Sequence, residues 1–518
     1  MAEINETEVA SIIKGLKNSK AKDVYGIDAN FIKAHKDILV CPITRMINMS
    51  IRHSIVPTAW KVATITPIFK SGNKNNVNNY RPISILPIIS KILEKWVAKQ
   101  LTTHLDKGHT PLHPMQFGFR AKYSTESAIN LFLEKVKHDL DYCPVVGAVF
   151  LDLKRAFDTV DHQILLSRLT KFNFSEQAVS WMKSYLSTRT HCVTVSGIKS
   201  TFLNCEVGVP QGSILGPILF SLYINDLPNI CPHFHTQLYA DDAVIFTNAK
   251  SNSEVSEKLT SAMCCIDEWL SKSCLLLNSK KTVCMFFSKR PTARTSSNVF
   301  IKGEELQIVD KFKYLGVILD STLSFKNHVK HMCKIVNFNL RNFRQIRTSL
   351  PENAAKMFLH CMIFSHIEYC ITNWSLTSLT TLKPIESLYK KALKIFDKKP
   401  YSFHHCLILE KYNILNFENF RTFKMACSVY KILHGLSPPS LNEFIKFISS
   451  TSGRVTRAAT RGDCVVPYRR TAFSQQVLSV KGTTVWNSIP ADIRDCTTFI
   501  VFKTKLKGWL KGNQTCNH

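Results

Sequence analysis

Residues 235–247 read His-Thr-Gln-Leu-Tyr-Ala-Asp-Asp-Ala-Val-Ile-Phe-Thr, with two short apolar runs around the pair Asp241 and Asp242. The β-branched and aromatic residues predict two strands with Ala240-Asp241-Asp242 at the turn between them. Upstream, the apolar run from Pro144 to Leu153 predicts a buried strand that ends at Asp152. The sequence therefore predicts three carboxylates at the ends of apolar strands.

Adjacent carboxylates between apolar strands repel each other and are poorly solvated unless a cation lies on them. Mg²⁺ binds carboxylate and phosphate oxygens and keeps several waters. Two such ions about 3.5–4 Å apart stabilise the attacking and the leaving oxygen of an in-line displacement. Asp152, Asp241 and Asp242 are thus candidate ligands of two metal ions. The alternative is an ordinary turn, because Asp side chains also bond their own backbone there.

The rest of the chain predicts a mixed α/β fold. Helical spacing covers 88–105, 163–186 and 254–270, and short strands are expected at 191–195, 201–206, 282–288, 300–308 and 312–319. From about residue 320, apolar residues at helical spacing alternate with Lys and Arg, over 325–347, 353–364, 376–397 and 417–434. A Ser/Thr/Arg-rich stretch at 449–462 is expected to be a linker.

The composition is strongly basic, with 67 Lys and Arg against 38 Asp and Glu, a net charge of +29. Such an excess favours a polyanionic partner and predicts salt-dependent binding. A solvated basic surface or a ribosome-associated protein is the alternative. The start of the chain shows no secretory signal, and no apolar stretch is long enough to span a membrane. We therefore expect an intracellular protein of the nucleus or cytoplasm, not secreted.

The 17 cysteines are scattered, without a C-x-x-C pair, which favours a reducing compartment. Two His/Cys groups could bind zinc in principle: His328, His331 and Cys333, and Cys231, His233 and His235. Neither has a second pair at zinc-finger spacing, so ordinary surface or core roles are the preferred interpretation.

Further sequence blocks surround the three aspartates in a fixed order. They are 20–23, 26–28, 60–61, 67–70 (Pro-Ile-Phe-Lys), 79–84 (Asn-Tyr-Arg-Pro-Ile-Ser), 116–120 (Gln-Phe-Gly-Phe-Arg), 208–213 (Gly-Val-Pro-Gln-Gly-Ser), 277–282 (Leu-Asn-Ser-Lys-Lys-Thr) and 312–316 (Phe-Lys-Tyr-Leu-Gly). In this order the chain resembles the reverse transcriptases of non-LTR retrotransposons, LINE-type elements of the Jockey-like kind. The similarity extends over nearly the whole chain.

The resemblance implies a role for each matching residue. Asp152, Asp241 and Asp242, with the carbonyl of Leu153, would hold two Mg²⁺ ions, for which Mn²⁺ is the alternative. Phe157 would pack under the deoxyribose and exclude a 2′-hydroxyl, beside Tyr239 in the substrate site.

Other blocks imply contacts with substrate and primer. Gln211 and Gly212 would hold the incoming nucleotide and the template base, and Lys70 and Arg81 would bind the triphosphate. Lys281 would protonate the leaving pyrophosphate, an assignment that Lys280 leaves open. Tyr314-Leu315-Gly316 would form the primer grip.

The implied architecture is a right-hand polymerase: an N-terminal helical extension at 1–50, fingers and an antiparallel-sheet palm within 51–318, a basic helical thumb at 319–448, and a linker with a small C-terminal unit at 449–518. The implied partners are an RNA template, a DNA primer or target DNA, and dNTPs, without a membrane. The family's endonuclease is not found before the polymerase blocks, so that activity would come from elsewhere.

Two other functions are considered. A catalytically silent, truncated copy would only bind nucleic acid. An intron-encoded maturase is disfavoured, because the stretch Thr484 to Pro490 matches LINE-type tails.

Overall fold

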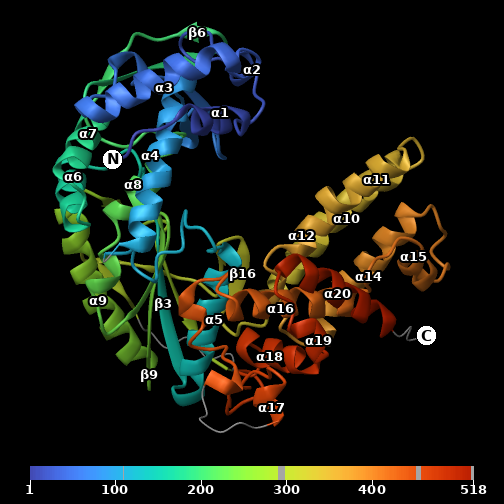
Figure 1. Cartoon of the computed structure of the whole chain (residues 1–518). Coiled ribbons are helices and arrows are strands. Elements are labelled where there is room, and N and C mark those ends of the chain that lie inside the picture. The colour runs from blue at the N-terminus through green and yellow to red at the C-terminus, as the bar shows by residue number, and fades with distance from the viewer. Residues whose placement is uncertain (109, 290–297, 451–456, 515–518) are drawn as a thin grey trace. The chain divides into compact units, whose positions relative to one another are not determined.

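The structure is a computed structural model that describes residues 1–108, 110–289, 298–450 and 457–514 (Figure 1). The chain forms two compact units, each built from interleaved segments, and each is described by itself. The first comprises Met1–Phe119, Leu151–Ala243 and Cys264–Lys281, and the second comprises Arg120–Phe150, Val244–Met263 and Thr282–His518. The expected mixture of helices and sheets is confirmed. The ranges predicted for fingers, palm and thumb stay predictions.

The first unit contains a sheet of order β2-β1-β5-β6, with β7 also paired to β5. Strands β1 and β2 form an antiparallel hairpin in which Ile68 pairs with Arg81, and β1 runs parallel to β5. The unit's elements are α1 (Glu6–Lys14), α2 (Ala29–Ala34), α3 (Lys36–His53), β1 (Val62–Phe69), β2 (Tyr80–Ile85), α4 (Ile88–Lys107), β4 (Leu153–Lys154), α6 (His162–Lys171), α7 (Glu176–Leu186), β5 (Arg189–Val195), β6 (Ile198–Lys199), β7 (Leu203–Cys205), α8 (Gly216–Tyr223), β8 (His235–Tyr239) and β10 (Leu276–Leu277).

The helix predicted over 163–186 is in fact two helices, α6 and α7. Asn173 adopts a left-handed φ of 56°, which ends the first helix. Ser175 then caps the second helix by accepting a hydrogen bond from the Ala178 N–H. The prediction of one helix was wrong because the apolar spacing continues across the short turn. The polar residues Asn173 and Ser175 end one helix and begin the next.

The second unit contains four neighbouring strands in the order β14-β11-β3-β9. Its elements are α5 (Thr125–Tyr142), β3 (Val145–Leu151), β9 (Asp242–Ala249), β11 (Val283–Phe287), β12 (Phe300–Ile301), β13 (Glu304–Glu305), β14 (Gln307–Ile308), β15 (Lys311–Tyr314), β16 (Val317–Asp320), α10 (Lys326–Ile346), α11 (Glu352–Phe358), α12 (Ser365–Glu368), α13 (Ile371–Trp374), α14 (Leu379–Phe396), α15 (His405–Lys411), α16 (Phe417–Leu433), α17 (Arg457–Thr460), α18 (Leu478–Ser488), α19 (Ala491–Arg494) and α20 (Phe499–Gly512). Strands β3 and β9 each have end residues that belong to the first unit.

Every side chain of β3 is buried, as its continuous apolar sequence predicts. One core joins this sheet, α5 and the helices after residue 320. Helices α10 and α11 lie side by side, with Phe343 and Phe358 stacked at 4.8 Å (Figure 1). Two strand predictions need correction: 312–319 is a hairpin of β15 and β16, and 300–308 holds three two-residue strands.

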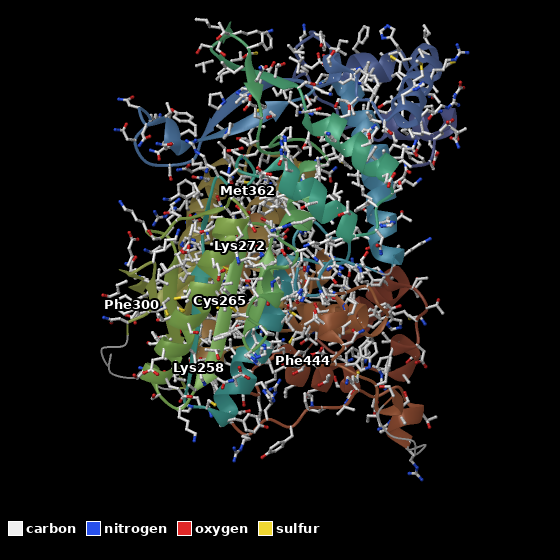
Figure 2. The ribbon with its side chains drawn as sticks, turned by 90° about the vertical axis from the view of Figure 1, so that its left-hand side faces the viewer. Lys258, Cys265, Lys272, Phe300, Met362 and Phe444 are labelled. Carbon is white, nitrogen blue, oxygen red and sulfur yellow. The ribbon has the colours of Figure 1, made fainter. Side chains whose placement is uncertain are left out.

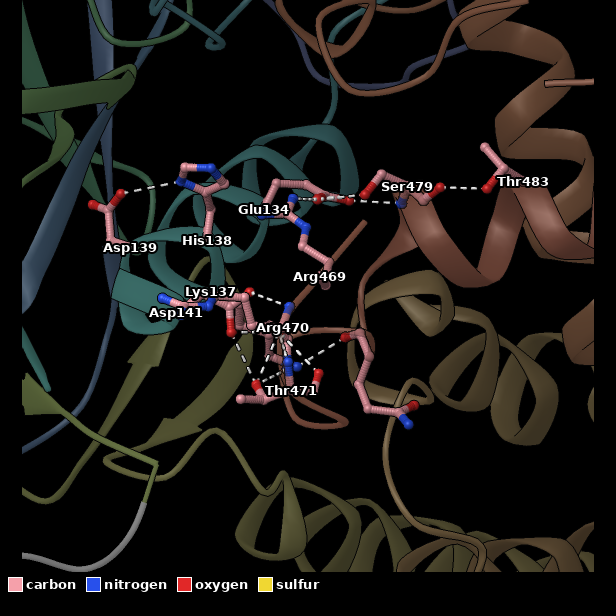
Figure 3. Close-up of polar contacts among 12 residues, drawn as sticks. Glu134, Lys137, His138, Asp139, Asp141, Arg469, Arg470, Thr471, Ser479 and Thr483 are labelled. Carbon is pink, nitrogen blue, oxygen red and sulfur yellow. Dashed lines mark hydrogen bonds and ion pairs between the residues drawn. The ribbon is translucent and has the colours of Figure 1, made fainter. Parts of the chain in front are cut away.

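Helix α5 is joined to the C-terminal segment by buried polar contacts (Figure 3). Glu134 accepts hydrogen bonds from the N–H and the hydroxyl of Ser479, at 2.7 and 2.8 Å, and pairs with Arg469 at 2.9 Å. Lys137 donates to the Gln476 carbonyl at 2.8 Å, and burial lowers its pKa to about 8. Paired and hydrogen-bonded in this way, charges can be buried without a large unfavourable free energy. The segment 469–479 is therefore an integral part of the second unit's core.

Helix α9 (Asn252–Lys272) presents a polar face on which Lys258, Cys265 and Lys272 lie in line (Figure 2). Lys258 pairs with Glu254 and Lys272 with Glu268, both one helical turn apart, as is usual for a solvated face. Fifteen described cysteines form no disulfide bond, whereas Cys406 is disulfide-bonded. Within the described ranges, none of the helices has the length and apolar character needed to cross a membrane.

Candidate functional site

The turn with the paired aspartates lies after β8, as predicted. Ala240 has a left-handed φ of 56°, which places Asp241 and Asp242 at a tight change of direction. The preceding strand is held by residues 115–117: Phe117 N–H donates to the Leu238 carbonyl at 2.8 Å, and Leu238 N–H donates to the Met115 carbonyl at 2.9 Å. Residues 115–117 therefore support the turn from the side.

Gln116 and Gly118 complete this support. The fully buried Gln116 side chain accepts hydrogen bonds through Oε1 from the N–H of Gly118, at 2.8 Å, and of Ala240, at 3.3 Å. A Cβ added at Gly118 would lie 2.3 Å from the Ala240 nitrogen, so only glycine allows this approach. The block at 116–120 thus packs directly against the Asp241–Asp242 turn and holds it by hydrogen bonds.

Asp152 is held by the block that begins at Leu277. Strand β4, directly after Asp152, pairs antiparallel with β10, with Leu153 opposite Leu277. Asn278 then donates twice to Asp152, from its backbone N–H to the carbonyl and from Nδ2 to Oδ2, both at 2.8 Å. One carboxylate oxygen of Asp152 is thereby oriented by a neutral donor.

The three aspartates influence one another electrostatically. Burial raises the pKa of Asp241, the charge of Asp152 raises it further, and Arg81 and Lys70 lower it. Burial, followed by Asp241 and Asp152, raises the pKa of Asp242 to about 6. Carboxylates that lie close to one another suit a bound divalent cation, which relieves their mutual repulsion. The three side chains therefore fit the metal site predicted for them.

The aspartates are nevertheless not drawn into one tight cluster. Within the described ranges, the three-ligand group whose atoms all lie within 4.8 Å of one another is His404, His405 and Cys406, in which Cys406 is disulfide-bonded. The two zinc candidates of the sequence, around His328 and around Cys231, do not form such a group in the part of the chain that the structure describes.

Lys70 and Arg81 lie together at the loop end of the β1–β2 hairpin. Lys70 N–H donates to the Asn79 carbonyl at 2.8 Å, and both basic side chains are exposed. Their charges reach Asp241, and that of Lys70 also reaches Asp158. The structure thus places two cations of the hairpin near the carboxylates.

Phe157 lies half-buried against two aromatic rings. It stacks on Phe220, with centroids 4.6 Å apart, and meets Phe119 edge-on at 6.4 Å. Its carbonyl accepts a hydrogen bond from the Val209 N–H at 2.8 Å. Gly208 packs so closely on Asp158 that a Cβ would lie 2.7 Å from that residue's carbonyl oxygen. These contacts join the Asp152 segment to the Gly208–Ser213 block.

Gln211 and Gly212 lie between this segment and β2. The Gln211 side chain donates to Asp158 Oδ1 at 3.0 Å, and its carbonyl accepts from the Ser84 N–H at 2.7 Å. Gly212 has a φ of 121°, and a Cβ there would lie 2.6 Å from the Ser84 carbonyl oxygen. Asp158 therefore orients Gln211. Position 212 requires glycine both for its positive φ and for its close approach to the Ser84 backbone.

The remaining predicted residues are distributed between the two units. Leu153 and Tyr239 are half-buried in the first unit, and Lys280 and Lys281 are both exposed, so their ambiguity persists. Tyr314-Leu315-Gly316 lies in the second unit, at the turn of the β15–β16 hairpin. Leu315 and Gly316 have φ values of 43° and 85°, as a tight two-residue hairpin turn requires.

Tyr369 supports this turn from within the second unit. Its hydroxyl donates to the Leu315 carbonyl at 2.8 Å and contacts the Thr125 hydroxyl at 3.1 Å. Its ring lies under Gly316, where an added Cβ would be 2.8 Å from Cε1. Sequence reasoning identified neither Tyr369 nor the supporting roles of Gln116, Asn278 and Asp158, because their partners are distant in sequence or were assigned no role.

Residues 71–319 match the family model for reverse transcriptase (RNA-dependent DNA polymerase). The chain is 29% identical over 409 residues to the RNA-directed DNA polymerase from mobile element jockey of Drosophila funebris, covering 76% of this chain and 44% of that protein. It is 33% identical over 399 residues to the probable RNA-directed DNA polymerase from transposon X-element of Drosophila melanogaster, covering 75% and 43%. The chain therefore spans less than half the length of these relatives.

Among solved structures, apo telomerase from Candida tropicalis aligns over 70% of this chain and 61% of that chain, with 14% identity and a TM-score of 0.40. The family relationship rests on the sequence matches, which include the blocks that build the site. Residues 71–319 are thus a reverse transcriptase domain, and about three-quarters of the chain is similar in sequence to the RNA-directed DNA polymerases of the jockey and X-element mobile elements.

Proposed function

We propose that this chain is an RNA-directed DNA polymerase that extends the 3′-hydroxyl of a DNA primer on an RNA template, using dNTPs. The observation that carries the proposal is the electrostatic coupling of Asp152, Asp241 and Asp242 beside the cations of Lys70 and Arg81. Asn278 holds Asp152, and Gln116 holds the turn that carries the other two aspartates. The net charge of +29 supports a nucleic-acid partner.

Asp152, Asp241 and Asp242 would hold two Mg²⁺ ions, with the Leu153 carbonyl as a further ligand. When bound, the ions would lower the pKa of the primer hydroxyl and neutralise charge on the pyrophosphate. The reverse transcriptase family in general uses divalent metal ions, and Mn²⁺ would be the substitute here. Asn278 orients Asp152 for this role through the contact at Oδ2.

The chain's other residues bind and orient the substrates. Lys70 and Arg81 would bind the triphosphate, Arg81 through two parallel hydrogen bonds and Lys70 as a point charge. Gln211 and Gly212 would hold the nucleotide against the template base, beside Tyr239. Phe157, fixed by its stacking on Phe220, would exclude a 2′-hydroxyl. Lys281 or its neighbour Lys280 would donate a proton to the departing pyrophosphate.

Tyr314, Leu315 and Gly316 would position the primer end, the role that a rigid hairpin turn suits. Copying of an element's RNA in the nucleus is the setting that we infer for such a polymerase.

A primer-extension assay tests the proposal, with purified chain, an RNA template, an annealed DNA primer, Mg²⁺ and dNTPs. We expect extension by wild type and its loss in Asp241→Asn. Asp37→Asn is the matched control, because the side chain of Asp37 is 92% exposed on α3. A folded wild-type chain that binds RNA yet extends no primer would instead be a silent nucleic-acid-binding copy.

A further inference from the structure

Helix α8 follows the Gly208–Ser213 block, and the Ser213 hydroxyl accepts a hydrogen bond from the helix's first N–H, that of Gly216, at 2.9 Å. Its N-cap residue, Leu215, provides no side-chain hydrogen bond to the helix's first N–H groups. A second acceptor comes from α4: Glu94 Oε2 accepts the Ile214 N–H at 2.6 Å, and the Leu215 N–H also bonds this carboxylate. A carboxylate distant in sequence thus binds the two backbone N–H groups that lead into the helix.

Glu94 is itself held in place. Its side chain is fully buried, and Oε1 accepts hydrogen bonds from the Tyr185 hydroxyl, at 3.0 Å, and the Ser90 hydroxyl, at 3.4 Å. The buried Arg189 donates to the Tyr185 carbonyl at 3.0 Å, and its charge acts on Glu94. The carboxylate therefore has partners on both oxygens and a nearby countercharge.

The chain between Ile214 and Gln211 is short and braced. Ser213 donates through its hydroxyl to the Pro210 carbonyl at 2.8 Å, and the Gly216 N–H donates to the same hydroxyl at 2.9 Å. A movement of Ile214 should therefore reach Gly212, two residues away, which packs closely against the Ser84 backbone.

We propose that Glu94 is a positioning residue for nucleotide binding: it holds the N-terminus of α8 and thereby fixes where Gln211 and Gly212 meet the incoming nucleotide. The inference rests on the proposed function of that loop. Glu94 does not touch the substrate, because its carboxylate is enclosed by Ile214, Tyr185 and Ser90.

The second unit offers a matched control. Glu134 is also buried, at 2% exposure, and also accepts a backbone N–H at the start of a helix, because the Ser479 N–H at the start of α18 donates to it at 2.7 Å. Glu134 and Glu94 are thus both buried carboxylates that accept a backbone N–H at the start of a helix, one in each unit. Loss of stability alone would appear in variants of both residues, whereas altered nucleotide binding would appear only at Glu94.

The test compares Glu94→Asp, Glu94→Gln and Glu134→Asp in the full chain. Asp keeps the charge but is shorter by one carbon–carbon bond, about 1.5 Å. Gln keeps the reach, and its amide can accept from Ile214 while donating to Tyr185. We expect Glu94→Asp to raise the KM for dNTP about tenfold, the effect of losing a charge-assisted hydrogen bond.

We expect Glu94→Gln to raise that KM by less than about threefold, and Glu134→Asp to leave it within about twofold of wild type despite a lower Tm. The primer–template Kd should stay unchanged in all three. A Glu94→Asp KM equal to that of wild type overturns the inference, as does a larger effect of Gln than of Asp, which would indicate a purely electrostatic role toward Arg189.

A second variant and a second measurement test the inference if the first experiment fails. If Glu94→Asp does not fold, Tyr185→Phe removes a partner of Glu94 without changing charge, and an unaltered KM there overturns the inference. If wild type extends no primer, the proposed function fails first. Hydrogen exchange of residues 211–215 then still decides the positioning role, because Glu94→Gln should retain the wild-type protection and Glu94→Asp should lose it.

Discussion

Replacing Gly118 by Ala should slow nucleotide addition, although alanine can adopt the φ and ψ angles of this position. The added Cβ would lie 2.3 Å from the Ala240 nitrogen and 2.9 Å from its Cα. Ordinary contact begins near 3.4 Å, so the turn must move by about 1.1 Å (3.4 − 2.3). Gly118 has no left-handed φ, so this clash is the main cost.

Asp241 and Asp242 follow Ala240 directly and would move with it. A misplacement of about 1 Å costs on the order of 10²-fold in rate, which is the fall in kcat that we expect. Overpacking of this kind also costs about 1–3 kcal/mol of stability. The measurement is single-nucleotide incorporation at saturating dNTP and Mg²⁺, together with thermal unfolding.

Gly508→Ala is the control, because its Cβ would meet no atom within 4 Å in the exposed part of α20. That variant should keep the wild-type kcat. If Gly118→Ala is folded and its kcat lies within about threefold of wild type, against the 10²-fold estimate, the reasoning from close approach is refuted.

Phe157→Val should increase ribonucleotide incorporation, because a smaller side chain leaves room for a 2′-hydroxyl; an unchanged dNTP/rNTP preference in competition assays would remove Phe157 from this role. Tyr369→Phe deletes only the hydroxyl that bonds the Leu315 carbonyl, and should shorten the lifetime of the primer–template complex in a trapping assay without altering the KM for dNTP. An unaffected lifetime would argue against the support of the hairpin. Burial lowers the pKa of His328 to about 4, whereas the unfolded chain takes up this proton near 6.5. Its contribution is therefore present above pH 6.5 and lost as the pH falls toward 4, so that His328→Gln should flatten the fall of Tm over this range. A variant whose Tm falls as steeply as that of wild type would contradict this assignment.

The sequence predicted those parts of the site that are local. The strand before Asp152 is a continuous apolar run, and the turn at Asp241 is flanked by β-branched residues, so pattern alone located both. The role of Asn278 could not be predicted in this way, because its partner Asp152 lies 126 residues away. Only the pairing of β4 with β10 brings the two residues together.

The same limit applies to Glu94 and Gln116. A Glu within an apolar helix normally faces solvent, and nothing near position 94 shows that Ile214, 120 residues away, needs an acceptor. The hairpin of 312–319 is a different case. Gly316 ends the sequence block at 312–316. Its left-handed φ produces a turn where the apolar periodicity indicated one continuous strand.

The contact between Glu134 and Arg469 has a consequence for synthesis on the ribosome. The two residues are 335 positions apart, and translation at about 5–20 residues per second separates their appearance by roughly 20–70 s. During that interval Glu134 lacks the guanidinium and the Ser479 donors that make its burial favourable. Helix α5 therefore reaches its final environment only after translation has passed residue 479. The core of the second unit is completed when the segment 469–479 packs against this helix.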